Sequence, residues 1–598
     1  MTPPFLVFDF PQPLCFTEPI EVIAAETVAE VIPALHRVQE ANEAGLYAAG
    51  YIAYEAAPAF DSALTVHPSI PGLPLLWFGL FDKPRDMPKA EQNISGPVEG
   101  LQPDTDIKEY QEAIHSIHAG IEAGSFYQVN HTFRLGAEWR EDGLGLYRRL
   151  IEASGAKYSA FLNLGRHQII SASPELFFHR EGSRLSTRPM KGTRPRGRWC
   201  EEADAIAAEL ACAEKDRAEN LMIVDLLRND LGRIAVNGSV KVPKLFEIEQ
   251  YPTLWQMTST VEAEIPAALG LVDIFTALFP CGSVTGAPKV SAMKRIAALE
   301  SSPRGPYCGA IGTISPSGEA VFNVAIRTAV IDTETRRLQY GVGGGIVWDS
   351  TAESEYEEAL SKAAILAAET PKFELLETLC WEDGGYTLRE RHLARLLSSA
   401  NYFRVPVSRS AAEAALDDAA ASFGEAKMRV RLLIASDGVP RIESRLLLPL
   451  PEFPLSAVLA SIPVNKNDPF LCHKTTNRAV YEAHMRAHPE AFDVLLWNEE
   501  GELTEFTIGN LVIKNDEGLW TPPRECGLLG GVLRAQLLSE DKLCERILRR
   551  EDLTAATSVW LINSVRGFVP VQIDIHPGEA SLEGSHTFRV PLAAGPQQ

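Results

Sequence analysis

The sequence predicts an α+β protein of two large domains, and three observations support this. A chain of 598 residues is longer than one hydrophobic core usually supports. Short apolar runs bounded by proline and glycine, which are typical of strands, occur beside stretches with helical spacing. This pattern ends before Pro371 and starts again after it, so we expect domains over residues 1–370 and 371–598.

Both domains are expected to mix strands with amphipathic helices. In the first domain, apolar runs predict strands at 5–8, 50–54, 75–79, 126–130, within 158–187, at 325–328 and at 341–346. A polar connection is expected from 84 to 103. Helical patterns predict helices over 107–121, which Gly124 ends, over about 201–231, over 290–299 and from 353 to about 369. The second domain begins with a predicted strand at 373–378, a turn at 383–385 and a helix that contains 392–397.

Composition and charge exclude several classes of protein. At 45% hydrophobic and 23% charged residues, the chain has the composition of an ordinary globular protein. Its formal net charge of −23 argues against a nucleic-acid partner or an anionic membrane, because their phosphates would be repelled. The most apolar long run, 446–464, contains several prolines and a glutamate, so we do not expect it to span a membrane.

The cysteines and the first residues predict a cytoplasmic protein. The nine cysteines are scattered, with no C-x-x-C pair and no cysteine and histidine cluster at zinc spacing. Such usage fits a reducing compartment. Residues 1–16 have no basic region ahead of an apolar core, so no signal peptide is predicted.

Lys191 is a candidate nucleophile because of the residues around it. Residues 188–193 have the sequence Arg-Pro-Met-Lys-Gly-Thr, in which proline fixes φ and glycine lets the backbone approach a bound molecule. A lysine amine can add to carbon once it is held unprotonated, and burial lowers its pKa. The alternative is a solvated loop lysine, since most lysines are exposed.

An acidic helix and two glycine-rich segments follow Lys191 in the sequence. On the predicted helix over 201–231, Asp216, Glu219 and Asn220 share one face. That face is either solvated or, because the apolar residues 221–224, 226 and 227 adjoin it, close to a buried site. Residues 279–289 form a loop rich in glycine, serine and threonine that would offer N–H groups to an anion where a helix begins. The glycines of 341–346 would let a ligand approach the backbone of a strand.

The first domain carries a series of motifs in a characteristic order: Tyr127-Gln128-Val129-Asn130, Ser173-Pro174-Glu175, Pro189-Met190-Lys191-Gly192-Thr193, Asp216-Arg217-Ala218-Glu219, and the segments 228–233, 282–289 and 349–362. Together they resemble the chorismate-utilising enzymes, which include anthranilate synthase, isochorismate synthase and aminodeoxychorismate synthase component I. The first hundred residues match more loosely. The resemblance implies a fold of large β-sheet layers with outer helices, and a chorismate-binding core over about 100–370.

Two positions select a branch of this family. Isochorismate-forming members have a lysine that activates water where this chain has Gln128, and an amide cannot act as a general base at neutral pH. Ammonia is therefore the expected nucleophile. Anthranilate synthases usually carry alanine where this chain has Lys191, whereas aminodeoxychorismate synthases carry lysine. The resemblance implies that Lys191 adds to C2 of the ring while the C4 hydroxyl leaves, and that ammonia then enters at C4 as the lysine departs.

The resemblance also implies roles for other residues of the first domain. Glu175 would be the general acid that helps the hydroxyl leave. Glu219 and Glu358 would bind Mg²⁺, which takes carboxylate oxygens. The substrate carboxylates would be held by Arg327, Lys362, Thr285, Gly286 and the backbone of Gly343, Gly344 and Gly345. Cys281 stands where a glycine is expected, a departure that could narrow the loop without changing the chemistry.

The second domain has its own lysine, in Cys472-His473-Lys474-Thr475, followed by Glu505 ahead of Gly509-Asn510 and by Gly530-Gly531-Val532-Leu533-Arg534. A pyridoxal-phosphate site needs an amine for the Schiff base, a carboxylate for the pyridinium nitrogen and N–H groups for the phosphate. These motifs resemble the fold-type IV pyridoxal-phosphate enzymes, a group of aminotransferases and 4-amino-4-deoxychorismate lyase with a two-subdomain α+β fold. On that match, Arg395, Gly531, Val532 and Leu533 would hold the phosphate, and Leu533 replaces the threonine common in the aminotransferases.

The pairing of the two families predicts consecutive reactions on one chain. If residues 1–370 make 4-amino-4-deoxychorismate, a lyase in residues 371–598 would convert it to 4-aminobenzoate, a folate precursor, and pyruvate. One alternative is an anthranilate synthase-like first half with a C-terminal aminotransferase. Another is a non-catalytic second half that only dimerises or docks a partner.

The resemblance further implies partners. We find no cysteine nucleophile in a glycine-flanked elbow with a downstream His-x-Glu, as a glutaminase would need. A separate glutamine amidotransferase subunit is therefore expected to deliver ammonia. Fold-type IV enzymes are commonly dimers, so a homodimer through the second domain is expected.

Overall fold

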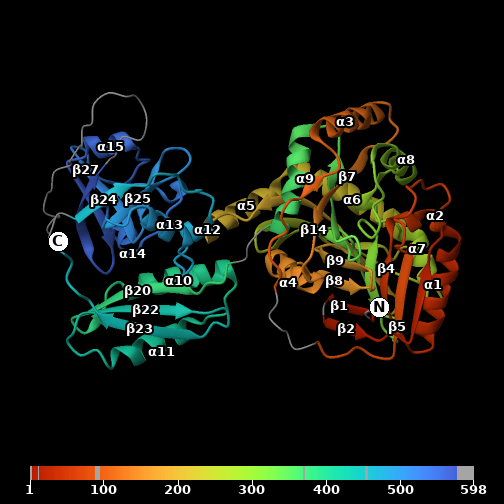
Figure 1. Cartoon of the computed structure of the whole chain (residues 1–598), viewed down its shortest axis with the longest axis horizontal. Helices are drawn as coiled ribbons and strands as arrows, with labels where there is room; N and C mark the ends of the chain where they lie inside the picture. The colour runs from red at the N-terminus through yellow and green to blue at the C-terminus, as the bar shows by residue number, and fades with distance from the viewer. Residues whose placement is uncertain (1–2, 11, 88–93, 368–370, 452–454, 575–598) are drawn as a thin grey trace. The chain divides into compact units, whose positions relative to one another are not determined.

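The computed structural model describes residues 3–10, 12–87, 94–367, 371–451 and 455–574. The chain forms two compact units, each considered separately below (Figure 1). The first comprises Met1–Arg196 and Ala207–Thr370, and the second comprises Gly197–Ile206 and Pro371–Gln598. The units divide at Pro371, where the sequence predicts the boundary. The segment 197–206 differs from the prediction, since it groups with the second unit.

One sheet of the first unit carries the strands of the glycine-rich motif. Its strand order is β15-β7-β19-β18-β9-β8-β1-β2, with β6 also paired to β7. The strands are β1 (Phe5–Asp9), β2 (Pro13–Thr17), β6 (Gln102–Pro103), β7 (Gln128–Glu138), β8 (Tyr158–Asn163), β9 (His167–Ser173), β15 (Gly286–Ala287), β18 (Thr328–Asp332) and β19 (Arg337–Ile346). Residues 337–346 of β19 pair with 129–138 of β7 in antiparallel register.

The other sheet of the first unit carries Lys191. Its strand order is β12-β14-β11-β10-β17-β16-β4-β5-β3, with β13 paired to β14. The strands are β3 (Glu21–Ala25), β4 (Tyr47–Ile52), β5 (Leu76–Phe81), β10 (Leu176–Glu181), β11 (Arg184–Arg188), β12 (Met190–Pro195), β13 (Lys241–Gln250), β14 (Leu254–Glu264), β16 (Ala310–Ile314) and β17 (Ala320–Val324). The strand β12 that contains Lys191 lies at one end of this order.

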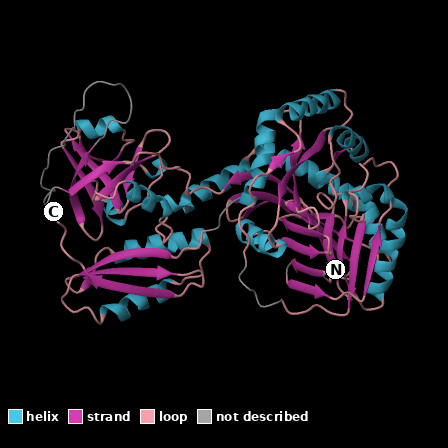
Figure 2. Cartoon of the chain, viewed as in Figure 1, coloured by secondary structure: helices cyan, strands magenta, loops and turns pink. Residues whose placement is uncertain are grey.

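The two sheets pack against each other, and helices cover their outer faces (Figure 2). Alternating side chains explain this, because Ala160 and Leu162 of β8 pack between the sheets while Phe161 packs with the helices. The first sheet packs against α3 (Ile107–Glu122), α4 (Gly143–Ser154), α8 (Lys289–Leu299) and α9 (Ala352–Ala367). The second buries α1 (Val28–Glu43), α2 (Ala57–Phe60), α6 (Glu214–Gly232) and α7 (Leu271–Leu278). In the described part of the chain, no helix has the length and apolar character needed to cross a membrane.

Several elements of the first half differ from their predicted bounds; the strand predicted at 50–54, for example, ends at Ile52. The expected helix over 201–231 is two helices, α5 (Cys200–Cys212) and α6, because Ala213 is extended with ψ 109°. Acidic residues in the first turn of α6 favour a new N-terminus there, although no glycine or proline marks the break. The strand predicted at 325–328 begins only at Thr328, since Arg327 has a φ of 50°. The strand predicted from 126 begins at Gln128.

The second unit contains two subdomains, as the α+β prediction requires. A four-stranded antiparallel sheet has the order β21-β20-β22-β23 and packs against α10 (Arg389–Phe403) and α11 (Arg409–Ala420). An eight-stranded sheet has the order β26-β25-β24-β31-β30-β27-β28-β29, and β26 also pairs with β27. The strands are β20 (Leu375–Glu382), β21 (Gly385–Tyr386), β22 (Met428–Ile434), β23 (Pro440–Leu446), β24 (Leu455–Leu459), β25 (Asp493–Trp497), β26 (Leu503–Phe506), β27 (Gly509–Asn515), β28 (Gly518–Thr521), β29 (Cys544–Glu545), β30 (Ser558–Asn563) and β31 (Gly567–Asp574). The other helices of the second unit include α12 (Pro469–Cys472), α13 (Ala479–Ala487), α14 (Val532–Ser539) and α15 (Arg550–Ala555).

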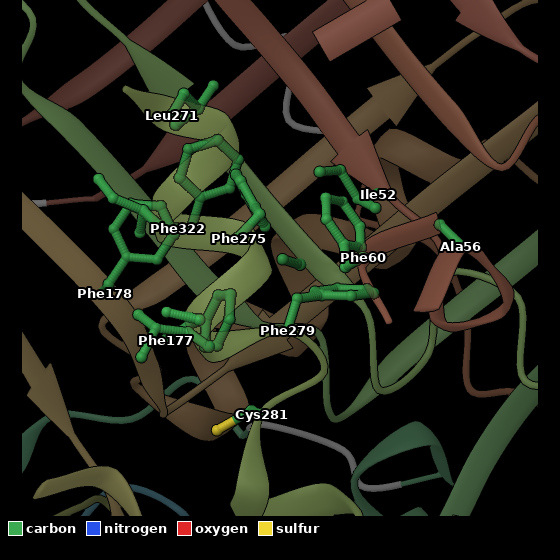
Figure 3. Close-up of a cluster of buried hydrophobic side chains, with 14 of the residues drawn as sticks. Ile52, Ala56, Phe60, Phe177, Phe178, Leu271, Phe275, Phe279, Cys281 and Phe322 are labelled. Atoms are coloured by element: carbon green, nitrogen blue, oxygen red, sulfur yellow. The ribbon is translucent and has the colours of Figure 1, made fainter. Parts of the chain in front are cut away.

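A cluster of phenylalanine rings fixes α7 to the second sheet of the first unit (Figure 3). Phe275 is fully buried, and its ring centroid lies 5.2 Å from that of Phe322 and 5.4 Å from that of Phe178. Close aromatic pairs of this kind add to the free energy gained from burying apolar surface.

We predict that Phe275→Ala lowers the free energy of unfolding of the first unit by about 3–5 kcal/mol, because it leaves a cavity that the rings cannot fill. Urea unfolding curves, with calorimetry as a second method, would measure this difference in the free energy of unfolding. The control is Val236→Ala, whose side chain is 48% exposed, and it should change stability by less than about 0.5 kcal/mol. Equal effects of the two substitutions would contradict the prediction.

Candidate active sites

Lys191 and Gln128 meet at Gly345. Lys191 lies on β12, Gln128 begins β7, and Gly345 lies near the end of β19. A Cβ atom added to Gly345 would lie 2.9 Å from Lys191 Nζ and 2.1 Å from Gln128 Nε2. Gly345 must therefore lack a side chain, and the two sheets of the first unit together bring an amine and an amide to one point.

The environment of Lys191 favours its neutral form. Burial lowers the pKa of the Lys191 amine, and the positive charge of Lys362 lowers this pKa further. The carboxylates of Glu219, Glu175 and Glu358 act in the opposite direction. Because desolvation is the largest cause, the amine is available as a nucleophile over more of the neutral pH range than a solvated lysine.

Glu175 is a buried carboxyl group suited to proton donation. It lies between β9 and β10 with 3% of its surface exposed, and its Oε1 has no hydrogen-bond partner among the described residues. Burial raises the pKa of Glu175 to about 7, against the opposing effects of a hydrogen bond from Ser283 and the charge of Lys191. A carboxyl group with this pKa is partly protonated at neutral pH and can act as a general acid.

Glu219 on α6 and Glu358 on α9 face the charge of Lys191 from two helices. Burial raises the pKa of Glu219. Burial alone would also raise that of Glu358, but its pKa is lowered by Lys362, whose Nζ lies 2.9 Å from Glu358 Oε1. The described residues contain no group of three or more histidine, cysteine, aspartate or glutamate side chains placed to hold a metal. Two carboxylates fit a divalent cation whose other ligands are water and substrate oxygens.

Lys362, Gly344 and Gly286 lie close to this point, although not all of the predicted anion-binding residues present a side chain to it. Lys362 Nζ donates to the carbonyl of Gly343 at 2.9 Å, and a Cβ added to Gly344 would lie 3.7 Å from the same amine. The Thr285 hydroxyl instead donates to carbonyls of its own loop, at Cys281 and Gly282. Gly286 pairs with β7 so closely that a Cβ there would lie 2.2 Å from the Gln128 carbonyl oxygen. The Arg327 guanidinium makes no hydrogen bond or ion pair to any residue that the structure describes, so it is available to an anion.

In the second unit, Glu505 is buried and Lys474 is half-buried, and the pKa of each is shifted. Burial, together with the charges of Arg395 and Arg478, lowers the pKa of Lys474 to about 8. Burial raises the pKa of Glu505 to about 7, against a hydrogen bond from the Tyr481 hydroxyl, which donates to Oε1 at 2.8 Å. The Asn510 amide donates to Glu505 Oε2 at 3.2 Å. This unit therefore holds an amine and an oriented carboxyl group inside one fold.

Arg395 connects the helix α10 to the glycine-rich segment before α14. It donates from Nε and from a terminal nitrogen to Glu377 at 2.8 and 2.7 Å, and from its other terminal nitrogen to the Gly530 carbonyl at 3.1 Å. A Cβ added to Gly531 would lie 1.8 Å from Asn510 Oδ1, so only glycine fits there. Val532 begins α14, and Leu533 packs into a hydrophobic cluster.

These residues fit pyridoxal phosphate. They provide the amine of Lys474, the carboxyl group of Glu505, and a glycine-led helix start beside an arginine, which suits a phosphate. The fit rests on the donor types of these residues and on the desolvation of Lys474 and Glu505.

Sequence reasoning missed several partners of the predicted residues. Glu377, which is 1% exposed, accepts hydrogen bonds from Arg395 and from His392 Nδ1 at 2.7 Å. The signal for it was present, because a glutamate inside the apolar run Leu375-Leu376-Glu377-Thr378-Leu379 must be paired when buried. Tyr481 carried no comparable signal. Asn510 and Ser283 lie in motifs that the sequence singles out, but their contacts with Glu505 and Glu175 depend on the tertiary fold.

We predict that Glu377→Gln destabilises the second unit by about 3 kcal/mol at pH 7. Although burial alone would raise it, the Arg395 and His392 contacts lower the pKa of Glu377 from 4.5 to about 2. A lowered pKa gives stability that is complete above about pH 4.5 and is lost as the pH falls toward 2, so the difference from the wild type should shrink over that range. Urea unfolding at several pH values measures it.

The matched control is Glu390→Gln on α10, where the side chain is 72% exposed and paired with Arg409. It should change stability by less than about 1 kcal/mol at any pH. The assigned charge interaction would be contradicted if the stability difference between Glu377→Gln and the wild type stayed the same at every pH at which the wild type is folded.

Comparisons with known proteins agree with this geometry. The chorismate binding enzyme family matches residues 83–368, and the amino-transferase class IV family matches residues 374–573. Aminodeoxychorismate synthase component 1 of Escherichia coli K12 is 43% identical over 255 residues, which are 43% of this chain and 56% of that protein. The chain thus spans about half the length of that curated relative.

For two further proteins, the match covers a larger share of the other protein's length. Anthranilate synthase component 1 of Thermus thermophilus is 34% identical over 351 residues, 53% of this chain and 76% of that protein. The crystal structure of anthranilate synthase component I from Streptococcus pneumoniae superimposes with a TM-score of 0.52 at 26% identity, over 62% of this chain and 91% of that one. The chain therefore belongs to the chorismate-binding enzyme family and carries a C-terminal class IV aminotransferase domain.

Proposed function

We propose that this chain makes 4-aminobenzoate in two steps. The first unit would aminate chorismate at C4 to give 4-amino-4-deoxychorismate and water. The second would eliminate pyruvate from that intermediate to give 4-aminobenzoate. The aminodeoxychorismate synthase relatives and the class IV domain support this pairing.

The observation that carries the proposal is the meeting of Lys191 Nζ and Gln128 Nε2 at Gly345. A neutral lysine amine can form a bond to ring carbon, whereas the amide cannot remove a proton from water. This pair of groups favours covalent attack by lysine followed by entry of ammonia. It disfavours both hydrolytic chemistry and the direct amination expected where the lysine is absent.

In the first unit, Lys191 Nζ would form a bond to C2 of chorismate while the ring double bond shifts and the C4–O bond breaks. Glu175 would give its proton to the departing hydroxyl, which leaves as water. Ammonia would then form the C4–N bond as the double bond returns and Lys191 leaves C2 with its bonding electrons. Glu219 and Glu358 would hold Mg²⁺ against a substrate carboxylate, with Arg327 and Lys362 neutralising the remaining charge.

The ammonia would come from a separate glutamine amidotransferase subunit. The relatives named component 1 support a divided enzyme of this kind. A homodimer through the second unit remains a prediction from the resemblance.

In the second unit, Lys474 would remove the C4 proton of the intermediate and return a proton as pyruvate leaves. Bound pyridoxal phosphate supplies an electron sink for that step. Arg395 would hold the phosphate, and Glu505 would orient the ring nitrogen. The lowered pKa of Lys474 suits an amine that must take up and release a proton near neutral pH.

We predict that the purified chain with chorismate, Mg²⁺, ammonium and pyridoxal phosphate forms 4-aminobenzoate and pyruvate in equal amounts. Lys191→Ala should lower the first step by about a thousandfold or more, because its nucleophile is gone. Lys474→Ala should instead accumulate 4-amino-4-deoxychorismate. The controls Lys294→Ala and Lys514→Ala change exposed lysines of the two units and should behave as the wild type.

Other products would select other functions. Anthranilate would make the first unit an anthranilate synthase. Accumulation of 4-amino-4-deoxychorismate by the wild type would turn the second unit into an aminotransferase or a non-catalytic module. Use of glutamine by the purified chain alone would remove the need for a separate amidotransferase.

The first step should also slow as the pH rises through about 7, measured at a fixed concentration of free ammonia. The pKa of Glu175 is raised to about 7 by burial, so the protonated form that acts as an acid is lost above that value. Glu175→Gln should lower the rate by about 10²–10⁴-fold and remove this limb of the pH profile. A profile unchanged in the variant would assign the proton to another group.

A further inference from the structure

Residues Gly197–Ile206 come from the first half of the sequence but belong to the second unit. In the chain they follow β12, the strand of Lys191, and include the first half of α5. The question is what this segment does in a unit whose other residues all follow Pro371.

The segment is held to the second unit by charged and aromatic contacts. The Arg198 guanidinium donates to the carbonyls of Lys466 at 3.2 Å and Glu525 at 2.8 Å, and it also pairs with Glu202. Trp199 is 7% exposed, and the guanidinium carbons of Arg198 and Arg524 lie 4.7 and 4.5 Å from its ring. Hydrogen bonds from a guanidinium and stacking on a buried indole are among the stronger polar contacts in proteins.

The same segment reaches the residue next to Lys474. The Arg198 carbonyl accepts a hydrogen bond from His473 Nε2 at 3.0 Å, and His473 Nδ1 lies 2.9 Å from Ser399 Oγ. A carbonyl can only accept, so the proton of a neutral His473 is on Nε2, and Nδ1 accepts from the Ser399 hydroxyl. The His473 ring, 4% exposed, also lies 4.3 Å from the ring of Tyr402.

We propose that Arg198 and Trp199 are positioning residues for Lys474, so that this segment completes the site of the second unit. The side-chain contacts of Arg198 and Trp199 fix the Arg198 carbonyl, that carbonyl fixes the His473 ring, and His473 sets the backbone from which Lys474 extends. The inference rests on the proposed binding of pyridoxal phosphate to Lys474.

Removing either side chain frees the segment. In Arg198→Ala the Lys466 and Glu525 carbonyls lose a charged donor. In Trp199→Ala the guanidinium groups of Arg198 and Arg524 lose the ring that both contact. Each change lets the Arg198 carbonyl move away from His473. The lysine amine then has more orientations available, and forming a bond to the cofactor costs more conformational entropy.

The test uses the full chain, freed of cofactor and titrated with pyridoxal phosphate. Bound cofactor is followed by its absorbance band, and borohydride reduction with mass spectrometry identifies the lysine. We expect Arg198→Ala and Trp199→Ala to raise the Kd about tenfold, and to change the pH at which the band titrates. Arg198→Lys should recover part of the affinity, since an ammonium can still donate to both carbonyls.

The control is Asp204→Ala in the same segment, because this side chain is exposed and makes no hydrogen bond or ion pair to the described residues. It should match the wild type. Consumption of chorismate with ammonium shows whether the first unit of each variant is folded. If Arg198→Ala does not fold, His473→Phe, which keeps the ring and loses both hydrogen bonds, should give the same change in the band.

The outcomes separate this inference from the proposed function. If the wild type binds the cofactor at Lys474 and the Arg198 and Trp199 variants bind it equally well with an unchanged band, the inference is wrong. If the wild type itself forms no bond to pyridoxal phosphate at Lys474, the proposed function of the second unit falls, and the positioning role falls with it.

Discussion

The cost of removing a lysine ammonium from water is the constraint on which both sites depend. A buried amine is stable only when it loses its proton or when carboxylates surround it, and either solution needs a structure that excludes water. In the first unit, Lys191 is desolvated between the ends of two sheets, with Glu175, Glu219 and Glu358 around it. In the second, Lys474 shares its surroundings with Glu505, Glu377, Arg395 and Arg478. The two units have different folds, yet in each of them desolvation lowers the pKa of a lysine amine.

Glycine has a second role besides flexibility in these sites. At Gly345 and Gly531 a single added carbon would collide with a polar side chain that the site needs, Gln128 in one case and Asn510 in the other. The missing Cβ is thus what lets an amide reach into a strand or a helix start. This explains why the informative glycines lie next to polar groups, and why glycines in exposed turns, such as Gly384, make no close contact.

The sequence predicted most of the fold and singled out candidate site residues, because the signals for both are local. Helical spacing placed α3 and α8 nearly to the residue, and the motifs around Lys191, Glu175 and Lys474 depend on neighbours in the chain. The break at Ala213 could not be predicted, since no glycine or proline marks it. The partners Tyr481 and Ser283, and the membership of 197–206 in the second unit, depend on contacts between distant segments. The roles of the individual residues stay predictions until they are tested by substitution.

The membership of residues 197–206 in the second unit has a consequence for synthesis of the chain. During translation this segment leaves the ribosome more than 150 residues before Pro371 and still earlier than Lys474. Translation adds about 5–20 residues per second, so the part of the second unit that binds this segment is not synthesised until roughly 10–60 s later. During that time the indole of Trp199 and the guanidinium of Arg198 have no native partner from the second unit. The native contacts of this segment therefore form only after most of the second unit has been synthesised.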